Sequence, residues 1–320
     1  MALGALVGGV LGWQAIKGVS WRETANALAG FSPLYAVGAV ACFLANNFLR
    51  AMAWYLLFPQ RAPTVWRLFL VENTGIGVNN LLPLRWFSEA VQFAILRVRD
   101  RVPEGVALAT LGMTRVLDFQ ANFILLAVFF PLVPQVREHV ALGPILGLAF
   151  FLAFGSTMGL HLLGWAYRHL DWFRQVPLLS SVGEAVLALE ARLSRMALAL
   201  VLTLGQWVAL GGAAWLLALG TGIDLSIEGA VAVVILVTFM ATVVPGLLGG
   251  LGVFEFASVG VLVFFFGVEK SRALSCGLLM HALWWLPPVL VALFMLPLEG
   301  WGAIRELRRA ERGRVAPPQA

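Results

Sequence analysis

The chain has 320 residues, of which 60% are apolar and 12% are charged, with a formal net charge of +5 and a mean hydropathy of +0.88. Soluble domains contain about 45–50% apolar and about 25% charged residues, so this composition excludes a soluble globular enzyme. Disordered and fibrous classes are excluded as well, because the apolar residues form blocks of membrane-spanning length. The composition predicts an all-α polytopic membrane protein built as a helical bundle.

Nine apolar blocks follow one another along the chain. A helix needs about 20 residues to cross the hydrocarbon layer, and several blocks reach that length. No positively charged segment precedes the first block, as one would in a signal peptide, so we expect that block to be retained. The blocks cover residues 1–17, 31–58, 66–82, 105–133, 143–166, 196–219, 229–246, 247–267 and 273–297.

Two regions do not have the pattern of plain spans. Residues 66–98 carry Glu72 and several asparagines and are interrupted at Pro83. Residues 228–267 are interrupted by Pro245–Gly252, which has four glycines and one proline in eight residues. Broken backbone at membrane depth is tolerated only where protein or a watery cavity satisfies its amides. Each region is therefore predicted to form two half-helices that meet at a break in a re-entrant hairpin.

The distribution of arginines predicts the orientation in the membrane. Arginines cluster within 61–67, 97–101, 168–195 and 305–314, whereas the charged residues of the connection 220–228 are both acidic, Asp224 and Glu228. Because basic loops stay on the cytoplasmic side, we predict a multi-pass protein of the cell (inner, or cytoplasmic) membrane with a cytoplasmic C-terminal tail. The first broken region would then enter from the cytoplasm and the second from outside, as in an inverted repeat.

The chain is predicted to form one integral membrane domain, 1–320, with a first half (1–166), a second half (196–297) and a basic tail (298–320). Between the halves, the linker 167–195 is amphipathic, and its apolar residues share one helical face: Val182, Val186, Leu189 and Leu193. We interpret the linker as a cytoplasmic interfacial helix that joins two bundles. A helix that docks a partner protein is the alternative.

Ionisable residues inside apolar blocks are the main site candidates, because each costs about 2.5–3.5 kcal/mol to insert. Arg115 and Asp118 are three residues apart and share a helix face, either as a structural clamp or with Arg115 as a ligand for an anionic group. Glu89 and Glu255 each follow a proline break. They either cap half-helix amides or line a cavity, where they bind a cationic group or exchange a proton.

The other candidates lie near block ends and at the two breaks. Arg50 is near the end of its block and either snorkels to the interface or joins the site, and His281 either packs in the core or joins the site. The breaks supply the remaining candidates: Asn79, Asn80, Arg85, Gly249, Gly250 and Gly252.

Several chemistries have no signature in this sequence. There is no HExxH, P-loop or GxSxG motif, and the four histidines show no metal-ligand spacing. Two cysteines inside apolar blocks form neither a disulfide framework nor a zinc site. The sequence therefore predicts no metal, no cofactor and no recognisable catalytic constellation. Nucleic acid is excluded as a partner because the positive charge is not gathered in a compact basic domain.

Four sequence elements together resemble a flippase-like membrane domain family, best known as the transmembrane region of lysylphosphatidylglycerol synthases. The resemblance covers about residues 30–297, and its elements are Leu49–Trp54, Asn79–Pro83 with Arg85 and Glu89, Arg115–Asp118, and Pro245–Glu255. The family usually shows P-x-R-x-G-E, whereas Pro83–Glu89 is one residue longer and has serine for the glycine. Gln92 stands where an arginine is common.

The resemblance implies a lipid translocase (flippase) that moves an anionic phospholipid or lipid-linked head group through a polar intramembrane cavity. Arg85, Arg115 and half-helix amides would hold the head group, while Glu89 and Glu255 would balance its charge or respond to a proton. The soluble aminoacyl-transferase domain of the synthases is absent here, so we do not expect synthesis of lysylphosphatidylglycerol. Two alternatives stay open: an intramembrane enzyme acting on lipid head groups, and a non-catalytic partner that delivers lipid to a separate transferase.

Overall fold

The structure is a computed structural model that describes residues 2–59, 62–82, 87–139, 141–244 and 248–315. The described residues are helical apart from their connections and contain no β-strand, as predicted. The α-helices and 3₁₀ helices (η) follow in this order: α1 (Ala2–Ile16), α2 (Trp21–Ala29), α3 (Pro33–Leu56), α4 (Val65–Leu81), α5 (Phe87–Val98), α6 (Glu104–Phe129), η1 (Phe130–Leu132), α7 (Pro134–His139), α8 (Leu142–His169), α9 (Asp171–Gln175), α10 (Pro177–Glu190), α11 (Leu193–Gly220), α12 (Ile227–Val243), η2 (Leu248–Gly250), α13 (Val253–Phe266) and α14 (Lys270–Val315).

Each of the nine predicted apolar blocks contains a helix. Within the described ranges, five helical segments are long and apolar enough to cross a membrane: α3, α6 with η1, α8, α11 and α14 up to Gly300. By contrast, α1, α4, α12 and α13 have only 15, 17, 17 and 14 residues. At about 1.5 Å per residue, these four are shorter than a hydrocarbon layer of about 30 Å.

Hydroxyl side chains fix the starts of several helices. Ser20, Ser32, Thr64 and Ser226 each precede a helix, and each side-chain oxygen accepts a hydrogen bond from an amide of the first turn. Such a cap contributes typically about 1 kcal/mol. The cap at Ser20 begins α2, which the apolar pattern does not predict because this helix lies between two apolar blocks. Helix α2 packs against α14.

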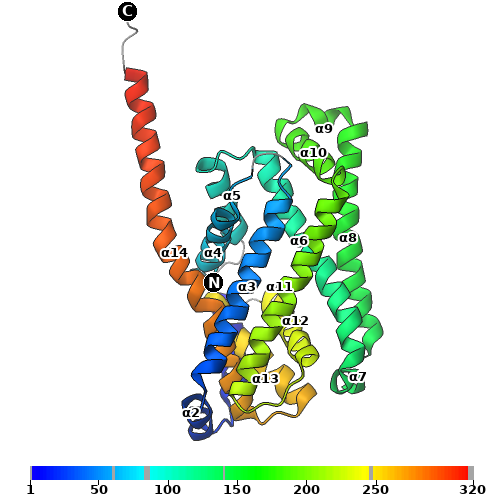
Figure 1. Cartoon of the computed structure of the whole chain (residues 1–320), viewed down its shortest axis with the longest axis vertical. Coiled ribbons are helices and arrows are strands. Elements are labelled where there is room, and N and C mark those ends of the chain that lie inside the picture. The colour runs from blue at the N-terminus through cyan, green and yellow to red at the C-terminus, as the bar shows by residue number, and fades with distance from the viewer. Residues whose placement is uncertain (1, 60–61, 83–86, 140, 245–247, 316–320) are drawn as a thin grey trace, which may run out of the picture.

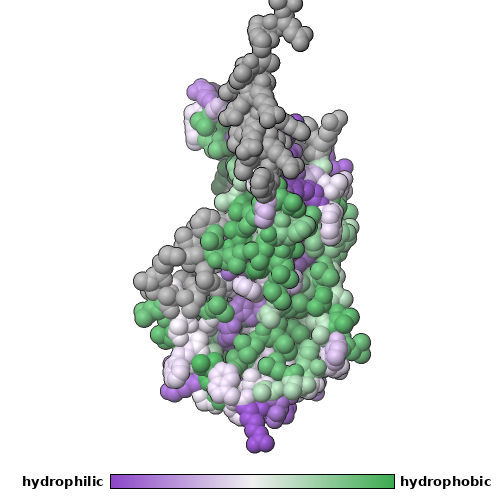
Figure 2. Space-filling model, turned by 90° about the vertical axis from the view of Figure 1, so that its left-hand side faces the viewer, coloured by the Kyte–Doolittle hydropathy of each residue, from purple (hydrophilic) through white to green (hydrophobic). Residues whose placement is uncertain are grey.

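Helices α3 and α11 lie side by side through the centre of the molecule (Figure 1). One buried apolar cluster joins α11, α12, α13 and α14 and includes Leu217, Val234 and Leu262. A second cluster joins α3, α4, α6 and α10 and includes Trp54 and Leu68. On the face shown in Figure 2, a broad hydrophobic belt lies between more polar ends, and a polar area interrupts the belt.

The basic and acidic connections lie at opposite ends of the molecule. The connection from α5 to α6 and the helices α9 and α10 lie at the end toward which α14 extends, whereas α2, α7 and the connection from α11 to α12 lie at the other (Figure 1). The arginine clusters within 97–101 and 168–195 thus lie away from the acidic connection 220–228. Arg272 is an exception to the positive-inside pattern, because it donates to the Gly222 carbonyl oxygen of that connection at 3.3 Å.

Both regions predicted to be broken are interrupted. Helix α4 ends before Leu82, and α12 ends before Val244. Leu82 and Val244 themselves have extended backbone conformations. The breaks themselves, 83–86 and 245–247, lie outside the described residues, and so does the predicted site residue Arg85. Within each region the two helices pack against each other, and the α4–α5 pair lies nearer the α9–α10 end than the α12–α13 pair does (Figure 1).

The second break packs closely against the N-terminal helix, and this contact requires glycine. Gly252 has a φ of +83°, and a Cβ added there would lie 1.9 Å from the carbonyl oxygen of Gly8 in α1. Left-handed backbone costs an L-residue about 1–2 kcal/mol, before any clash is counted. The sequence of the break is therefore constrained by packing as well as by conformation.

Replacing Gly252 with alanine should lower the thermal unfolding midpoint of the detergent-purified protein, because the strain and the clash with Gly8 add together. Gly260→Ala is the matched control, since it lies in α13 and has nothing within 4 Å of an added Cβ. The control should leave the midpoint unchanged or raise it, because alanine favours a helix by about 1 kcal/mol over glycine. Equal midpoints for Gly252→Ala and the unaltered protein would contradict the close contact.

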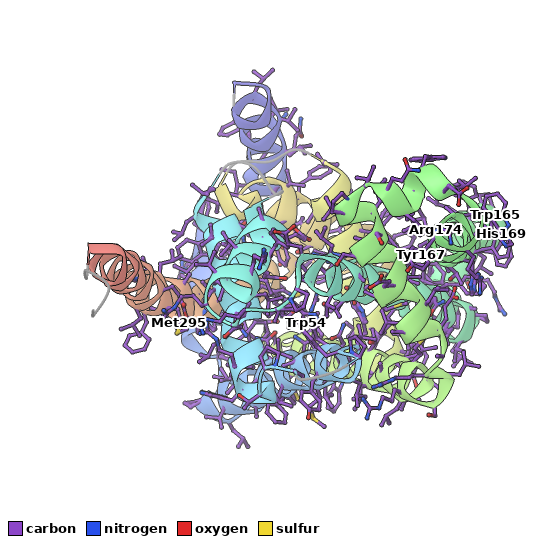
Figure 3. The ribbon with its side chains drawn as sticks, turned by 90° about the horizontal axis from the view of Figure 1, so that it is seen from above. Trp54, Trp165, Tyr167, His169, Arg174 and Met295 are labelled. Carbon is purple, nitrogen blue, oxygen red and sulfur yellow. The ribbon has the colours of Figure 1, made fainter. Side chains whose placement is uncertain are left out.

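The segment between the halves contains two short helices rather than the single helix predicted for it. Helix α8 continues to His169 and α11 begins at Leu193, with α9 and α10 between them. Val186 and Leu189 are buried as part of one apolar face, but Leu193 is 73% exposed because it begins the next helix. The Ser181 hydroxyl of α10 accepts a hydrogen bond from the Gly105 amide at 3.1 Å. Seen from above, α8–α10 form the edge opposite α14 (Figure 3).

Candidate functional site

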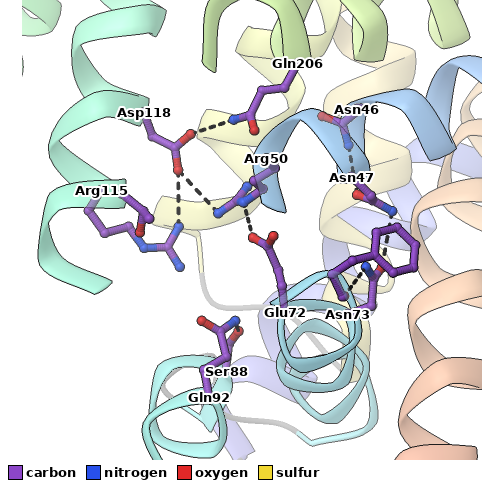
Figure 4. Close-up of polar contacts among 12 residues, drawn as sticks. Asn46, Asn47, Arg50, Glu72, Asn73, Ser88, Gln92, Arg115, Asp118 and Gln206 are labelled. Atoms are coloured by element: carbon purple, nitrogen blue, oxygen red, sulfur yellow. Dashed lines mark hydrogen bonds and ion pairs between the residues drawn. The ribbon is translucent and has the colours of Figure 1, made fainter. Parts of the chain in front are cut away.

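Charged side chains from four helices meet inside the bundle. Arg50 of α3 forms an ion pair with Glu72 of α4, and its Nη2 lies 3.3 Å from Oδ2 of Asp118 in α6. The same Asp118 oxygen lies 3.7 Å from Nη1 of Arg115, one turn earlier in α6 (Figure 4). Arg115 also pairs with Glu89 of α5. We call these five residues the ion-paired centre: Arg50, Glu72, Glu89, Arg115 and Asp118.

Asp118 is held rigidly from the side of α11. Its Oδ1 accepts hydrogen bonds from Gln206 Nε2 at 2.9 Å and from Trp207 Nε1 at 3.3 Å. Asp118 is 9% exposed and Glu72 is 5% exposed, so both carboxylates are removed from bulk solvent. Buried carboxylates persist only when they are paired, and Arg50 is the cation that both of them share.

The Arg115–Glu89 pair differs from the rest of the centre because it is open. Arg115 lies 11 residues into α6, so it is about 16 Å along the helix at about 1.5 Å per residue. That position is inside the apolar segment Glu104–Leu132, which is long enough to cross a membrane. The two side chains are nevertheless 46% and 39% exposed. Charges at this depth that protein does not cover need water or a polar ligand, which makes this pair the candidate binding position.

Uncharged polar side chains extend the centre along α3, α4 and α5. Asn46 donates to Asn47 at 2.9 Å, and Asn47 donates to Asn73 at 3.2 Å. Gln92, at the position where an arginine is common in the family that the sequence resembles, is buried and donates to the Ser88 hydroxyl at 3.0 Å. These contacts satisfy amides that would otherwise be costly in an apolar interior.

A second polar cluster lies at the second break. Glu255 Oε2 accepts a hydrogen bond from the Gly252 amide at 2.7 Å, and Oε1 lies 2.5 Å from Nδ1 of His281. The other ring nitrogen, Nε2, lies 3.1 Å from the Gly249 carbonyl oxygen. Glu255 therefore caps α13, as one of the two interpretations predicts, and also pairs with a base on α14. We call these residues the break cluster: Gly249, Gly252, Glu255 and His281.

The first break reaches the break cluster through its backbone. The Asn80 carbonyl oxygen, in the last turn of α4, accepts a hydrogen bond from Nε1 of Trp285 at 3.3 Å. A Cβ on Gly249 would lie 3.2 Å from that carbonyl oxygen and 2.5 Å from the Trp285 nitrogen. The end of α4 and the turn η2 thus approach each other beside α14.

The two acid–base pairs occupy corresponding positions in the chain. Glu89 and Glu255 are each the third residue of the helix that follows a break, α5 or α13. In both cases the paired base lies 26 residues further along, on the next membrane-spanning helix. The first base is Arg115 and the second is His281. This correspondence is what an internal repeat would produce.

Eight of the twelve predicted site residues lie in one of the two clusters. Among the described residues, no group of three histidine, cysteine or acidic side chains could hold a metal ion. Asn79 is half-buried in the last turn of α4, and Gly250 is buried in η2. The ion-paired centre contains the predicted residues Arg50, Glu89, Arg115 and Asp118, and the break cluster contains Gly249, Gly252, Glu255 and His281.

Glu72, Gln206 and Trp207 contact the charged residues of the ion-paired centre but are not among the predicted site residues. Glu72 lies so close to the start of its apolar block that a shallow position is as compatible with the sequence as a deep one. Gln206 and Trp207 are adjacent residues in the long apolar run of α11. A single glutamine in such a run indicates a buried polar contact, and this could have identified Gln206 from the sequence. Their shared contact with Asp118 depends on how α6 and α11 pack, which periodicity does not reveal.

The family model described as the lysylphosphatidylglycerol synthase TM region matches residues 1–292 of the chain. Comparisons with curated proteins and with solved structures gave no match. The matched range contains all residues of the ion-paired centre and of the break cluster.

Proposed function

The chain belongs to the family of lysylphosphatidylglycerol synthase transmembrane regions, and from this premise we propose that it is a lipid translocase for lipids with anionic head groups. Membership of the family, together with five helices able to cross a membrane, makes the chain a multi-pass membrane protein with a lipid-related role. The observation that carries the finer proposal is the half-exposed Arg115–Glu89 pair, whose arginine lies inside a segment long enough to cross a membrane.

Arg115 is the proposed contact for the head group. A guanidinium presents several N–H donors in a planar fork, which suits the oxygens of a phosphate. Glu89 neutralises Arg115 while the site is empty, and an arriving phosphate would exchange with the carboxylate. Arg115 thus has an anionic partner in both states, the carboxylate when the site is empty and the phosphate when it is occupied.

The rest of the ion-paired centre holds Arg115 in place. Asp118 is anchored by Gln206 and Trp207 of α11 and lies near Arg115 on the same helix. Arg50 is engaged by Glu72 and Asp118, so it serves as the counter-ion of buried carboxylates. We therefore assign substrate contact to Arg115 and a positioning role to Arg50 and Asp118.

The two broken helix pairs supply a basis for alternating access. The end of α4 and the turn η2 approach each other beside α14, and α4 and α12 have the same length of 17 residues. Rocking one pair against the other would open the polar centre to one leaflet and then to the other, while the acyl chains stay in lipid. The basic end of the molecule would face the cytoplasm.

The test uses purified protein in liposomes that carry phosphatidylglycerol labelled on an acyl chain. We expect the protein to expose inner-leaflet label to an external quencher faster than protein-free liposomes do, with the recovered lipid chemically unchanged. A phosphatidylcholine probe should move more slowly. A chemically altered lipid would instead support a head-group enzyme, and movement only after addition of a transferase would support lipid delivery. Equal rates with and without the protein would overturn the proposal.

A further inference from the structure

The break cluster contains a histidine with both ring nitrogens facing acceptors. Nδ1 lies 2.5 Å from a Glu255 oxygen, and Nε2 lies 3.1 Å from the Gly249 carbonyl oxygen. A carbonyl oxygen only accepts hydrogen bonds, and an ionised carboxylate only accepts as well. Two hydrogens are therefore needed for both contacts to be hydrogen bonds.

Only two protonation states supply those two hydrogens. One is an imidazolium with two N–H groups beside an ionised Glu255. The other is a neutral imidazole with its hydrogen on Nε2 beside a protonated Glu255 carboxyl group. Both states contain the same number of protons. A neutral imidazole beside an ionised carboxylate contains one proton fewer, and its single N–H can serve Glu255 or Gly249 but not both.

We infer that the Glu255–His281 pair is a proton-binding site, and that loss of its proton to water releases either α13 or the turn η2 from α14. The ligand is a single proton, and the bond that breaks on its release is N–H or O–H within the pair. Because η2 also contacts the end of α4, the release reaches the contact between the two interrupted regions. If the proposed translocation holds, this site makes the proton the coupling ion.

The pair is buried, and the groups recorded around it are neutral. The two side chains are 8% and 11% exposed, and Phe254 of α13 stacks on the imidazole ring at 4.6 Å between centroids. Trp284 of α14 lies against Phe254, and α1 meets the break through the backbone of Gly8. Within the described part of the chain, the charged group facing His281 is Glu255, and its other recorded neighbours are neutral.

The corresponding pair in the first half contains a different kind of base. Arg115 stays protonated at any physiological pH, and its pair with Glu89 is half exposed. Imidazole is the side chain that can gain or lose a proton near neutral pH, and His281 is buried together with its carboxylate partner. The same position in the two halves thus carries a permanent cation in one and a titratable base in the other, which separates anion binding from proton binding.

The proton site is tested first without transport. In protein labelled with ¹⁵N-histidine and placed in lipid nanodiscs, the resonance absent from His281→Gln should show a one-proton transition between about pH 5 and pH 9. Glu255→Gln should shift that transition, because the imidazole loses the carboxylate with which it shares the proton. A His281 resonance that does not change over this range in the unaltered protein would overturn the inference, and so would a transition unmoved by Glu255→Gln.

The coupling is tested in liposomes with an imposed pH difference. One proton crossing a difference of one pH unit releases about 1.4 kcal/mol, so labelled phosphatidylglycerol should accumulate up to about tenfold in one leaflet. His281→Gln and Glu255→Gln should still equilibrate the leaflets but should show no accumulation. Glu190→Gln is the matched control, because Glu190 forms a second histidine–glutamate pair, with His161 at 2.7 Å and outside both clusters. It should accumulate lipid as the unaltered protein does.

The two proposals fail in different ways. Equilibration without accumulation in the unaltered protein would overturn proton coupling and leave the translocase proposal intact. Absence of any lipid movement would overturn the translocase proposal, while the histidine titration would still decide whether the pair binds a proton.

Discussion

Replacing Arg115 with glutamine should slow translocation of labelled phosphatidylglycerol about 10- to 100-fold, because hydrogen bonds to a charged group contribute about 1.5–3 kcal/mol. Of the two arginines in the ion-paired centre, Arg115 is the more exposed, at 46%. It lies within a segment long enough to cross a membrane. The unfolding midpoint should change little, since Glu89 is itself 39% exposed and can be solvated once its partner is lost. The measurement is the rate of leaflet exchange at equal protein-to-lipid ratio.

Arg97→Gln is the matched control for this prediction. Arg97 pairs with Glu104 at 2.8 Å, and both side chains are 46% exposed, so the variant removes an equally open arginine–glutamate pair. That pair lies at the connection from α5 to α6, away from the centre. The control should exchange lipid at the unaltered rate. If Arg115→Gln and Arg97→Gln have the same rate as the unaltered protein, Arg115 does not contact the head group.

Replacing Arg50 with leucine should lower the free energy of unfolding by about 3–5 kcal/mol, because removal of one partner of a buried ion pair leaves an uncompensated charge. Arg50 pairs with two carboxylates. Without Arg50, Glu72 would keep fewer polar contacts than Asp118 would. Asp118 keeps its hydrogen bonds from Gln206 and Trp207. In contrast, Glu72 Oε2 has no hydrogen-bond partner among the described residues. The measurement is denaturant unfolding in mixed micelles.

The double variant Arg50→Leu with Glu72→Leu provides the control. Replacing a buried pair by apolar residues of similar volume is often neutral or stabilising, so the double variant should be more stable than Arg50→Leu alone. A double-mutant cycle then gives the coupling between the two residues. If Arg50→Leu unfolds at the same denaturant concentration as the unaltered protein, Arg50 is not the shared counter-ion that the geometry indicates.

Much of the fold could be predicted because the membrane imposes length and continuity on each element. The apolar blocks gave the positions of the helices, and Pro83 and the glycines near Gly249 gave the two interruptions. Helix α2 could not be found in this way, because its sequence is not apolar and its place is set by packing on α14. The split of the linker into α9 and α10 was missed for the same reason, since a shared helical face does not reveal where a helix stops.

The site was predictable where its contacts lie within one helix. Arg115 and Asp118 are one turn apart, and their proximity follows from helix geometry. The partners of Asp118 on α3 and α11 come from other parts of the chain, and no periodicity identifies them. Glu255 was open to two interpretations, and the structure shows it capping α13 while it also pairs with His281.

The most direct test of a head-group site within the membrane is an experimental structure of the protein in phosphatidylglycerol nanodiscs. We expect a phosphate within about 2.7–3.2 Å of the Arg115 guanidinium nitrogens, with the Glu89 carboxylate displaced from them. An Arg115 that remains paired with Glu89, with acyl chains or protein filling the space beside it, would contradict the account.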